Sequence, residues 1–367
     1  MACVACQPIR AKYRMNYINS LEPAGLIQHF MSHPPEGFEP LVSSEGQPGF
    51  FMRFDLLTTA DAETLRAVSK LPASAALRKL LTWRTLFFGT TVSEYAPMVA
   101  GCDAPGLLAS MLDAWRAQSR LLIIKDIPDQ SPLLPESDRQ TAAALREACR
   151  QAGFTMIAGQ ALAYVPIDFS SPDDYLARLS SGRRKDIRRK LKARAELHLD
   201  ILPTGCDKLH DPGFVQTLYD LYEEVYAQSE IHFDKLTADF FRAILQDASL
   251  DGHLFLYYSQ DRLIGFNLCF IHNNMLIDKY VGFRYPEARQ YNLYFISWME
   301  NLNFAIARQL THYVAGWTDP EIKAYLGAKF TFTHHAVYPR NPWLRKMLGK
   351  LSHHFEHDKA WFDAHQR

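Results

Sequence analysis

Hydrophobic and polar positions follow the clearest period in the second half of the chain. Phe214, Leu218 and Leu221 recur at the three- to four-residue spacing of a helix that buries one face. The apolar runs Leu254–Tyr258 and Leu263–Ile271 have the length of strands. In chain order, the pattern predicts a strand at His198–Leu202, helices at Pro212–Ser229 and Thr237–Gln246, strands at His253–Ser259, Arg262–His272 and Met275–Phe283, a helix at Asn292–Gln309, a strand at Thr311–Ala315, a short helix at Pro320–Leu326 and a strand at Lys329–Tyr338.

Turn and capping residues support this order. The pairs Gln260–Asp261 and Asn273–Asn274 separate three consecutive strands, which are therefore predicted to form an antiparallel meander. Thr237 is predicted to cap the second helix, and Gly327 is predicted to end the short one. The first half is less regular, and its final part predicts a helix at Leu107–Gln118, a strand at Arg120–Ile127, a helix at Glu136–Gln151 and strand segments at Gly153–Ala158 and Ala163–Phe169.

Composition narrows the class of protein. The 367 residues include 40 Lys and Arg and 40 Asp and Glu, and 48% are hydrophobic, as in a folded protein of two domains or one large one. Because the net charge is zero, nucleic-acid binding would have to rest on a local patch. No run approaches the roughly 18 apolar residues of a membrane-spanning helix, and no secretory signal is visible. We expect a cytoplasmic protein.

Potential metal ligands are scattered along the chain. The 6 cysteines predict reduced thiols, and the close pair Cys3 and Cys6 has no second pair to complete a zinc site. His334 and His335 are adjacent on a predicted strand, so they point to opposite faces. No metal site and no tightly bound cofactor are predicted.

Three segments resemble the FemAB-like branch of the GNAT (Gcn5-related N-acyltransferase) superfamily, namely Tyr175–Lys192, Arg262–Leu268 and Asp319–Phe330. The order of elements in the second half is also similar to the GNAT order, and the end of the first half repeats its tail. The resemblance implies an α+β fold of two GNAT-like halves, with central mixed, mostly antiparallel sheets flanked by helices. Residues 1–165 would be a degenerate half, 166–340 the catalytic half and 341–367 an amphipathic helix. The implied activity is N-acyl transfer from an activated donor to an amine, without a covalent enzyme intermediate.

The short helix before Gly327 is the most specific motif. Fem-type enzymes have a similar helix with a lysine shortly before a hydrophobic-glycine pair, and the resemblance places Lys323 at the acyl-transfer site. A fixed cation stabilises the oxyanion of the tetrahedral intermediate. Glu321, two residues earlier, is predicted to accept the amine proton as general base. An ordinary exposed helix is the alternative for both residues.

A run of basic residues precedes the second half. On a helix, Arg184, Arg188 and Lys192 share one face. Such a stripe suits the phosphates of an acceptor, of CoA, of tRNA or of an anionic membrane, and in Fem enzymes the corresponding segment contacts a nucleotide-linked acceptor. The alternative is a solvated helix face.

The sequence is compatible with more than one class of acyl donor. GNAT enzymes bind the pyrophosphate of CoA with a glycine-rich loop before the long helix, whereas the loop here contains Arg289, Gln290 and Asn292 but no glycine. These three residues are predicted to contact the donor. It would be an acyl-CoA or an acylated carrier protein as co-substrate, or alternatively a charged tRNA.

Further candidate pocket residues lie in the third strand of the meander and in the segment after the strand predicted at Thr311–Ala315. Asp278, Lys279, Tyr280, Trp317 and Asp319 are predicted to line the pocket, with Tyr280 as acyl contact or general acid unless it only packs in the strand. The acceptor would be a small-molecule amine or a lipid amine.

The tail Asn341–Phe362 predicts an amphipathic cationic helix that docks on its own domain or lies on an anionic membrane. The membrane alternative would make the protein peripheral at the inner membrane face and favour the lipid amine, as in bacterial ceramide-synthase-like N-acylation. A non-catalytic GNAT-like module that binds a lipid or nucleotide remains a second alternative.

Overall fold

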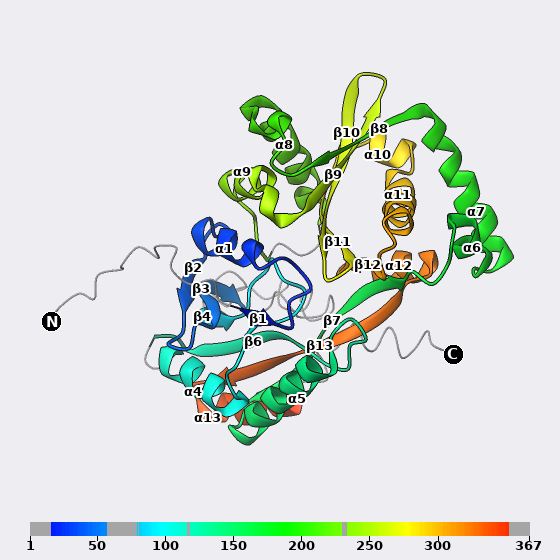
Figure 1. The fold of residues 1–367 in the computed structure, drawn as a ribbon. Coiled ribbons are helices and arrows are strands. Elements are labelled where there is room, and N and C mark those ends of the chain that lie inside the picture. The colour runs from blue at the N-terminus through cyan, green and yellow to red at the C-terminus, as the bar shows by residue number, and fades with distance from the viewer. Residues whose placement is uncertain (1–15, 57–78, 80, 116–117, 230–232, 352–367) are drawn as a thin grey trace, which may run out of the picture.

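One mixed sheet runs through both halves of the protein. The computed structural model describes residues 16–56, 79, 81–115, 118–229 and 233–351 (Figure 1). Eleven of the described strands form this sheet, in the order β2-β3-β4-β6-β13-β7-β12-β11-β10-β9-β8. Their bounds, in that order, are Glu39–Val42, Pro48–Asp55, Thr82–Phe88, Leu121–Pro128, Lys329–Pro339, Thr155–Pro166, His312–Gly316, Met275–Phe283, Arg262–His272, Gly252–Ser259 and Leu197–Pro203. A small second sheet pairs β1 (Tyr17–Ile18) with β5 (Met98–Val99).

Helices cover the sheet in separate groups (Figure 1). The helices are α1 (Gly25–Ser32), α4 (Ala104–Trp115), α5 (Glu136–Gln151), α6 (Pro172–Ala177), α7 (Ser181–Leu191), α8 (Pro212–Gln228), α9 (Ala238–Gln246), α10 (Glu287–Gln290), α11 (Leu293–Ala307), α12 (Pro320–Leu326) and α13 (Pro342–Leu351). Helices α4 and α5 share one hydrophobic core with the first half of the sheet. Helices α1, α8 and α9 bury a second core, and α6, α7, α11 and α12 a third. None of the described helices combines the length and apolar composition needed to cross a bilayer.

The two halves exchange their last strands. Strand β7 belongs to the first half by sequence but pairs with β12, while β13 of the second half pairs with β6. The exchanged strands also pair with each other at the centre of the sheet. The sequence predicts an α+β fold with a sheet in each half; the α+β class is confirmed, but the exchange joins the two sheets into one. The domain boundary after residue 165 falls at the end of β7 and stays a prediction.

Most predicted elements are confirmed. Helices α5 and α12 have the predicted bounds, and the Thr237 hydroxyl caps α9 by accepting the N–H of Phe240. The predicted strands at Gly153–Ala158 and Ala163–Phe169 are a correction, because β7 is one continuous strand. Of the predicted tail helix, α13 covers the first part, and residues from 352 on lie outside the described chain.

Candidate active site

Two parallel strand pairs open toward the same region of the molecule. Strands β4 and β6 stay paired only up to Phe88 and Ile124. Strands β11 and β12 stay paired only up to Ile277 and Val314. The side chains that follow each last pair meet between the halves, where the Lys125 ammonium lies 5.0 Å from the centre of the Trp317 ring. We call this region the junction.

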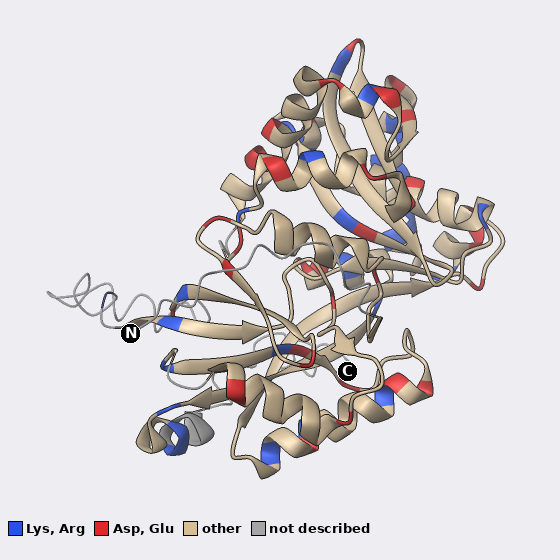
Figure 2. Cartoon of the chain, turned by 60° about the vertical axis from the view of Figure 1, so that its left-hand side comes forward, with Lys and Arg blue, Asp and Glu red and all other residues tan. Residues whose placement is uncertain are grey.

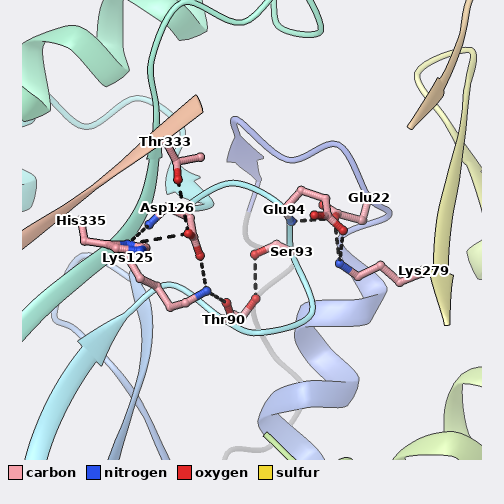
Figure 3. A network of polar contacts seen from close by, with 9 residues as sticks. All are labelled: Glu22, Thr90, Ser93, Glu94, Lys125, Asp126, Lys279, Thr333 and His335. Carbon is pink, nitrogen blue, oxygen red and sulfur yellow. Dashed lines mark hydrogen bonds and ion pairs between the residues drawn. The ribbon is translucent and has the colours of Figure 1, made fainter. Parts of the chain in front are cut away.

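A lysine of the second half lies between two carboxylates of the first (Figure 3). The Lys279 ammonium is 2.6 Å from Glu94 and 3.2 Å from Glu22, and all three side chains are at most 6% exposed. Lys279 is the extra residue of a β-bulge in β11, because Cys269 pairs with Asp278 and Leu268 with Tyr280.

Within this triad, the pKa values of Glu22 and Lys279 are shifted. Burial raises the pKa of Glu22 to about 7; Lys279 opposes this increase and Glu94 adds to it. Burial alone would lower the pKa of Lys279, but the two carboxylates outweigh it and raise the pKa. Within the described chain, the second carboxylate oxygens of Glu22 and Glu94 are buried without a hydrogen-bond partner.

The first half adds a second lysine–carboxylate pair (Figure 3). The buried Lys125 ammonium donates to the Thr90 carbonyl at 2.8 Å and to the Asp126 carboxylate. The Asp126 backbone N–H donates to Nδ1 of His335 at 3.1 Å, which places the proton of a neutral ring on Nε2. Burial lowers the pKa of His335, although Asp126 opposes this. Asp126 has φ +58°, a left-handed conformation of the kind found at functional sites.

The structure places Lys323 at the junction, where it is 5% exposed. Its ammonium donates to the carbonyls of Gly316, at 3.1 Å, and Trp317. Burial lowers the pKa of Lys323 to about 8; the charges of Asp278, Glu94 and Asp319 oppose this decrease. Thr318 and Asp319, with φ +66° and +46°, form the left-handed turn that starts α12 and returns Lys323 toward β12.

Asp278 is held by side chains of its own half. Its carboxylate accepts hydrogen bonds from Asn267 at 3.0 and 3.2 Å, Asn301 at 3.0 Å and the Tyr313 hydroxyl at 2.8 Å. Burial raises the pKa of Asp278, while Tyr313, Asn267 and the charge of Lys323 oppose the increase. The carboxyl group of the predicted pocket residue Asp278 is thus held in place near Lys323 by three side chains.

Other predicted catalytic residues lie elsewhere. Glu321 is exposed, and the structure does not bring it to Lys323, since residues two apart on a helix point in different directions. Tyr280 is buried and its ring lies 5.6 Å from that of Phe241, within the core under α9. Its hydroxyl has no hydrogen-bond partner within the described chain. The roles given to Glu321 and Tyr280 stay predictions.

The predicted donor-binding residues lie at the start of α11. Arg289 and Gln290 are exposed, and the Arg289 guanidinium donates to Gln228 at 3.0 Å and stacks on Tyr285 at 5.2 Å. Asn292 precedes α11 with φ +51°. Nothing in this geometry brings the three residues to Lys323.

The predicted basic stripe faces outward on α7. Arg184, Arg188 and Lys192 line an open hollow of about 590 Å³. Arg188 pairs with Asp173 at 2.8 Å. On the inner side, Arg183 donates to the Tyr325 carbonyl at 2.7 Å, so α7 contacts the helix that presents Lys323.

Sequence reasoning missed the first-half members of the junction: Glu22, Glu94, Lys125 and Asp126. Asp234, whose pKa is raised by burial although Lys125 and Lys279 oppose this, also lies close. One signal was available, since Lys125 and Asp126 interrupt the apolar strand Arg120–Ile127. Glu22 and Glu94 lie in loops without a pattern. No group of three or more potential metal ligands is found among the described residues.

Comparisons with known proteins agree with this architecture. A lysylphosphatidylglycerol synthetase (L-PGS) structure from Bacillus licheniformis is 11% identical over 91% of this chain and 98% of its own, with a TM-score of 0.52. The C-terminal domain of a protein described as such a synthetase from Agrobacterium fabrum is 12% identical over 88% and 94%, with a TM-score of 0.51. A FemX structure is 13% identical over 91% of this chain and 100% of its own, with a TM-score of 0.49.

The structural matches show the GNAT-like fold that the sequence predicts. A search among curated proteins found no significant match. The profile of the FemAB-like family, described as peptidoglycan biosynthesis/recognition, matches residues 138–364, more than half of the chain. The chain therefore belongs to the FemAB-like family.

Proposed function

We propose that the protein transfers an activated acyl or aminoacyl group to an amine at the junction. The observation that supports this proposal best is the convergence of both open strand pairs on one buried cluster. In this cluster Lys279 pairs with Glu22 and Glu94, and the charge of Glu94 also acts on Lys323. Three buried groups of this cluster, Glu22, Lys279 and Lys323, have shifted pKa values, which favours catalysis over passive binding in a fold of this type.

The cluster suits the chemistry of amide formation. The amine nitrogen attacks the acyl carbon, the bond to the donor's oxygen or sulfur breaks, and the amine proton leaves. Lys323, held by two carbonyls, would stabilise the oxyanion in its protonated form. Glu22, with a pKa of about 7, would accept the amine proton near neutral pH. We assign Glu22 this role because Glu321 is exposed, whereas Glu22 is buried in the cluster.

The donor we propose first is a thioester, acyl-CoA or an acylated carrier protein, with a small-molecule or lipid amine as acceptor. A second candidate is a charged tRNA. The loop before α11 favours this candidate, because it lacks the glycines that bind the pyrophosphate of CoA in GNAT enzymes. Its Arg289 also already contacts Gln228 and Tyr285. Two structural neighbours are named lysylphosphatidylglycerol synthetases, which favours an aminoacyl donor and a lipid acceptor.

A donor panel tests the proposal. The full chain is mixed with acetyl-CoA, long-chain acyl-CoA, acylated carrier protein or mixed charged tRNA, and both thermal stabilisation and amine-dependent donor consumption are followed. We expect one donor class to be consumed, and Lys323→Met to abolish consumption, whereas Lys329→Met at an exposed position leaves it intact.

Charged tRNA alone would select the second candidate. No binding and no consumption across the panel would contradict acyl transfer and favour a non-catalytic module. Full activity in Lys323→Met would overturn the site.

A further inference from the structure

Four arginines lie side by side at the end of the sheet opposite the junction. Arg53 and Arg84 are direct partners in the β3–β4 pair. The Arg120 N–H donates to the Arg84 carbonyl at 3.4 Å, and the Arg340 N–H donates to the Arg120 carbonyl at 2.9 Å. All four residues, here called the arginine row, line one open hollow of about 390 Å³. Figure 2 shows blue segments gathered at strand ends in the lower half of the fold.

Within the described chain, one of the four residues in the arginine row has an acidic partner. Glu39 pairs with Arg84 at 2.6 Å, with both side chains exposed. Within the described chain, Arg53, Arg120 and Arg340 have no ion pair. Like charges directly opposite in a sheet are destabilising, so an unbalanced row is favourable only beside an anion. Guanidinium groups match the geometry of phosphate oxygens in two parallel hydrogen bonds.

Aromatic rings hold two of the guanidinium groups in place. Arg84 stacks on Phe51 at 3.9 Å and Arg340 lies 5.6 Å above Trp115. Three residues after Arg340, in the first turn of α13, the Trp343 side chain is 79% exposed. A free phosphate would not require an exposed indole. Trp at the edge of a basic face is typical of proteins that rest on the headgroup region of a membrane.

We infer that the arginine row and Trp343 form a docking surface for an anionic phospholipid bilayer. The four guanidinium groups would contact lipid phosphates while the indole enters the headgroup region. This surface is separate from the junction, because Lys125 lies five positions beyond Arg120 along β6, about 17 Å of extended strand. The inference does not depend on which donor the junction takes.

Vesicle sedimentation of the full chain tests this inference. Vesicles contain phosphatidylcholine alone or phosphatidylcholine with phosphatidylglycerol. We expect binding to the anionic vesicles alone, and its loss at 1 M salt, where the screening length falls to about 3 Å. Each basic residue near an anionic surface contributes a factor of about 5, so Arg53→Gln/Arg120→Gln should bind on the order of 25-fold more weakly.

Matched controls separate this surface from general charge attraction. The double variant Arg150→Gln/Arg242→Gln also removes two positive charges, but from exposed ion pairs on helices α5 and α9. It should change vesicle binding little. Trp343→Ala should weaken vesicle binding without changing its salt dependence.

Equal losses in the two double variants would overturn the inference, as would equal binding to neutral vesicles. It is also overturned if the arginine variant loses affinity for tRNA while its vesicle binding is unchanged. Thermal unfolding of each variant shows that it is folded.

Discussion

Replacing Lys323 by methionine measures the free-energy cost of holding this amine in the junction. Burial lowers the pKa of Lys323 to about 8 in the folded chain, whereas it is about 10.4 in an unfolded chain. Between these values the unfolded chain keeps a proton that the folded chain has lost, so stability rises with pH. From pH 7 to pH 9.5, the contribution of Lys323 to the free energy of unfolding should rise by about 2 kcal/mol.

Urea unfolding of the wild type and of Lys323→Met at both pH values gives this quantity. Other groups titrate in both proteins, so the difference between the two isolates Lys323. The variant also leaves the carbonyls of Gly316 and Trp317 without their hydrogen-bond donor. Each unpaired carbonyl should lower the free energy of unfolding by about 1–3 kcal/mol, and this loss does not depend on pH. A wild-type-minus-variant difference that stays flat from pH 7 to 9.5 would refute the reasoning. The exposed Lys329→Met is the matched control.

Three further changes test the site and the fold. Because burial raises the pKa of Glu22 to about 7, the folded chain holds a proton that the unfolded chain loses above its ordinary pKa. The free energy of unfolding of the wild type should therefore fall by about 2.5 kcal/mol relative to that of Glu22→Gln between pH 5 and 8 in urea unfolding. Asp278→Asn leaves at least one hydrogen-bond donor without an acceptor and should lower the free energy of unfolding by about 1–3 kcal/mol in the same assay. Thr237→Ala removes the cap of α9, which should lower the free energy of unfolding by about 1 kcal/mol and lower the melting temperature accordingly.

The elements of the second half could be predicted because local signals there agree with the fold. Asn273 and Asn274 both adopt positive φ, which suits the tight turn between two antiparallel strands. Gly159 lies between the two predicted strands that are one continuous strand, β7, in the structure. A glycine between two apolar runs suggests a break, but a Cβ here would lie 2.1 Å from the Thr333 hydroxyl. The glycine permits close approach of β13 and does not end the strand.

The strand exchange had no local signal. An apolar strand is compatible with several neighbours, and the partner of β7 is fixed only when both halves have assembled. The same reason explains why Glu22 and Glu94 were missed. They contact Lys279 across 257 and 185 positions of sequence. Lys323 could be found because its motif is local, whereas the carboxylates that complete its surroundings are not.

The charge balance of the junction connects its stability to its proposed chemistry. Three lysines there, Lys125, Lys279 and Lys323, lie among five carboxyl groups, which belong to Glu22, Glu94, Asp126, Asp234 and Asp278. A buried lysine without a partner charge is strongly destabilising, so Lys279 requires the carboxylates that the first half supplies. With these carboxylates ionised the cluster has an excess of negative charge, and Glu22, with a pKa of about 7, can reduce it by taking up a proton. Amine acylation releases one proton, and we expect the junction to accept it at Glu22 because protonation there reduces the excess of negative charge.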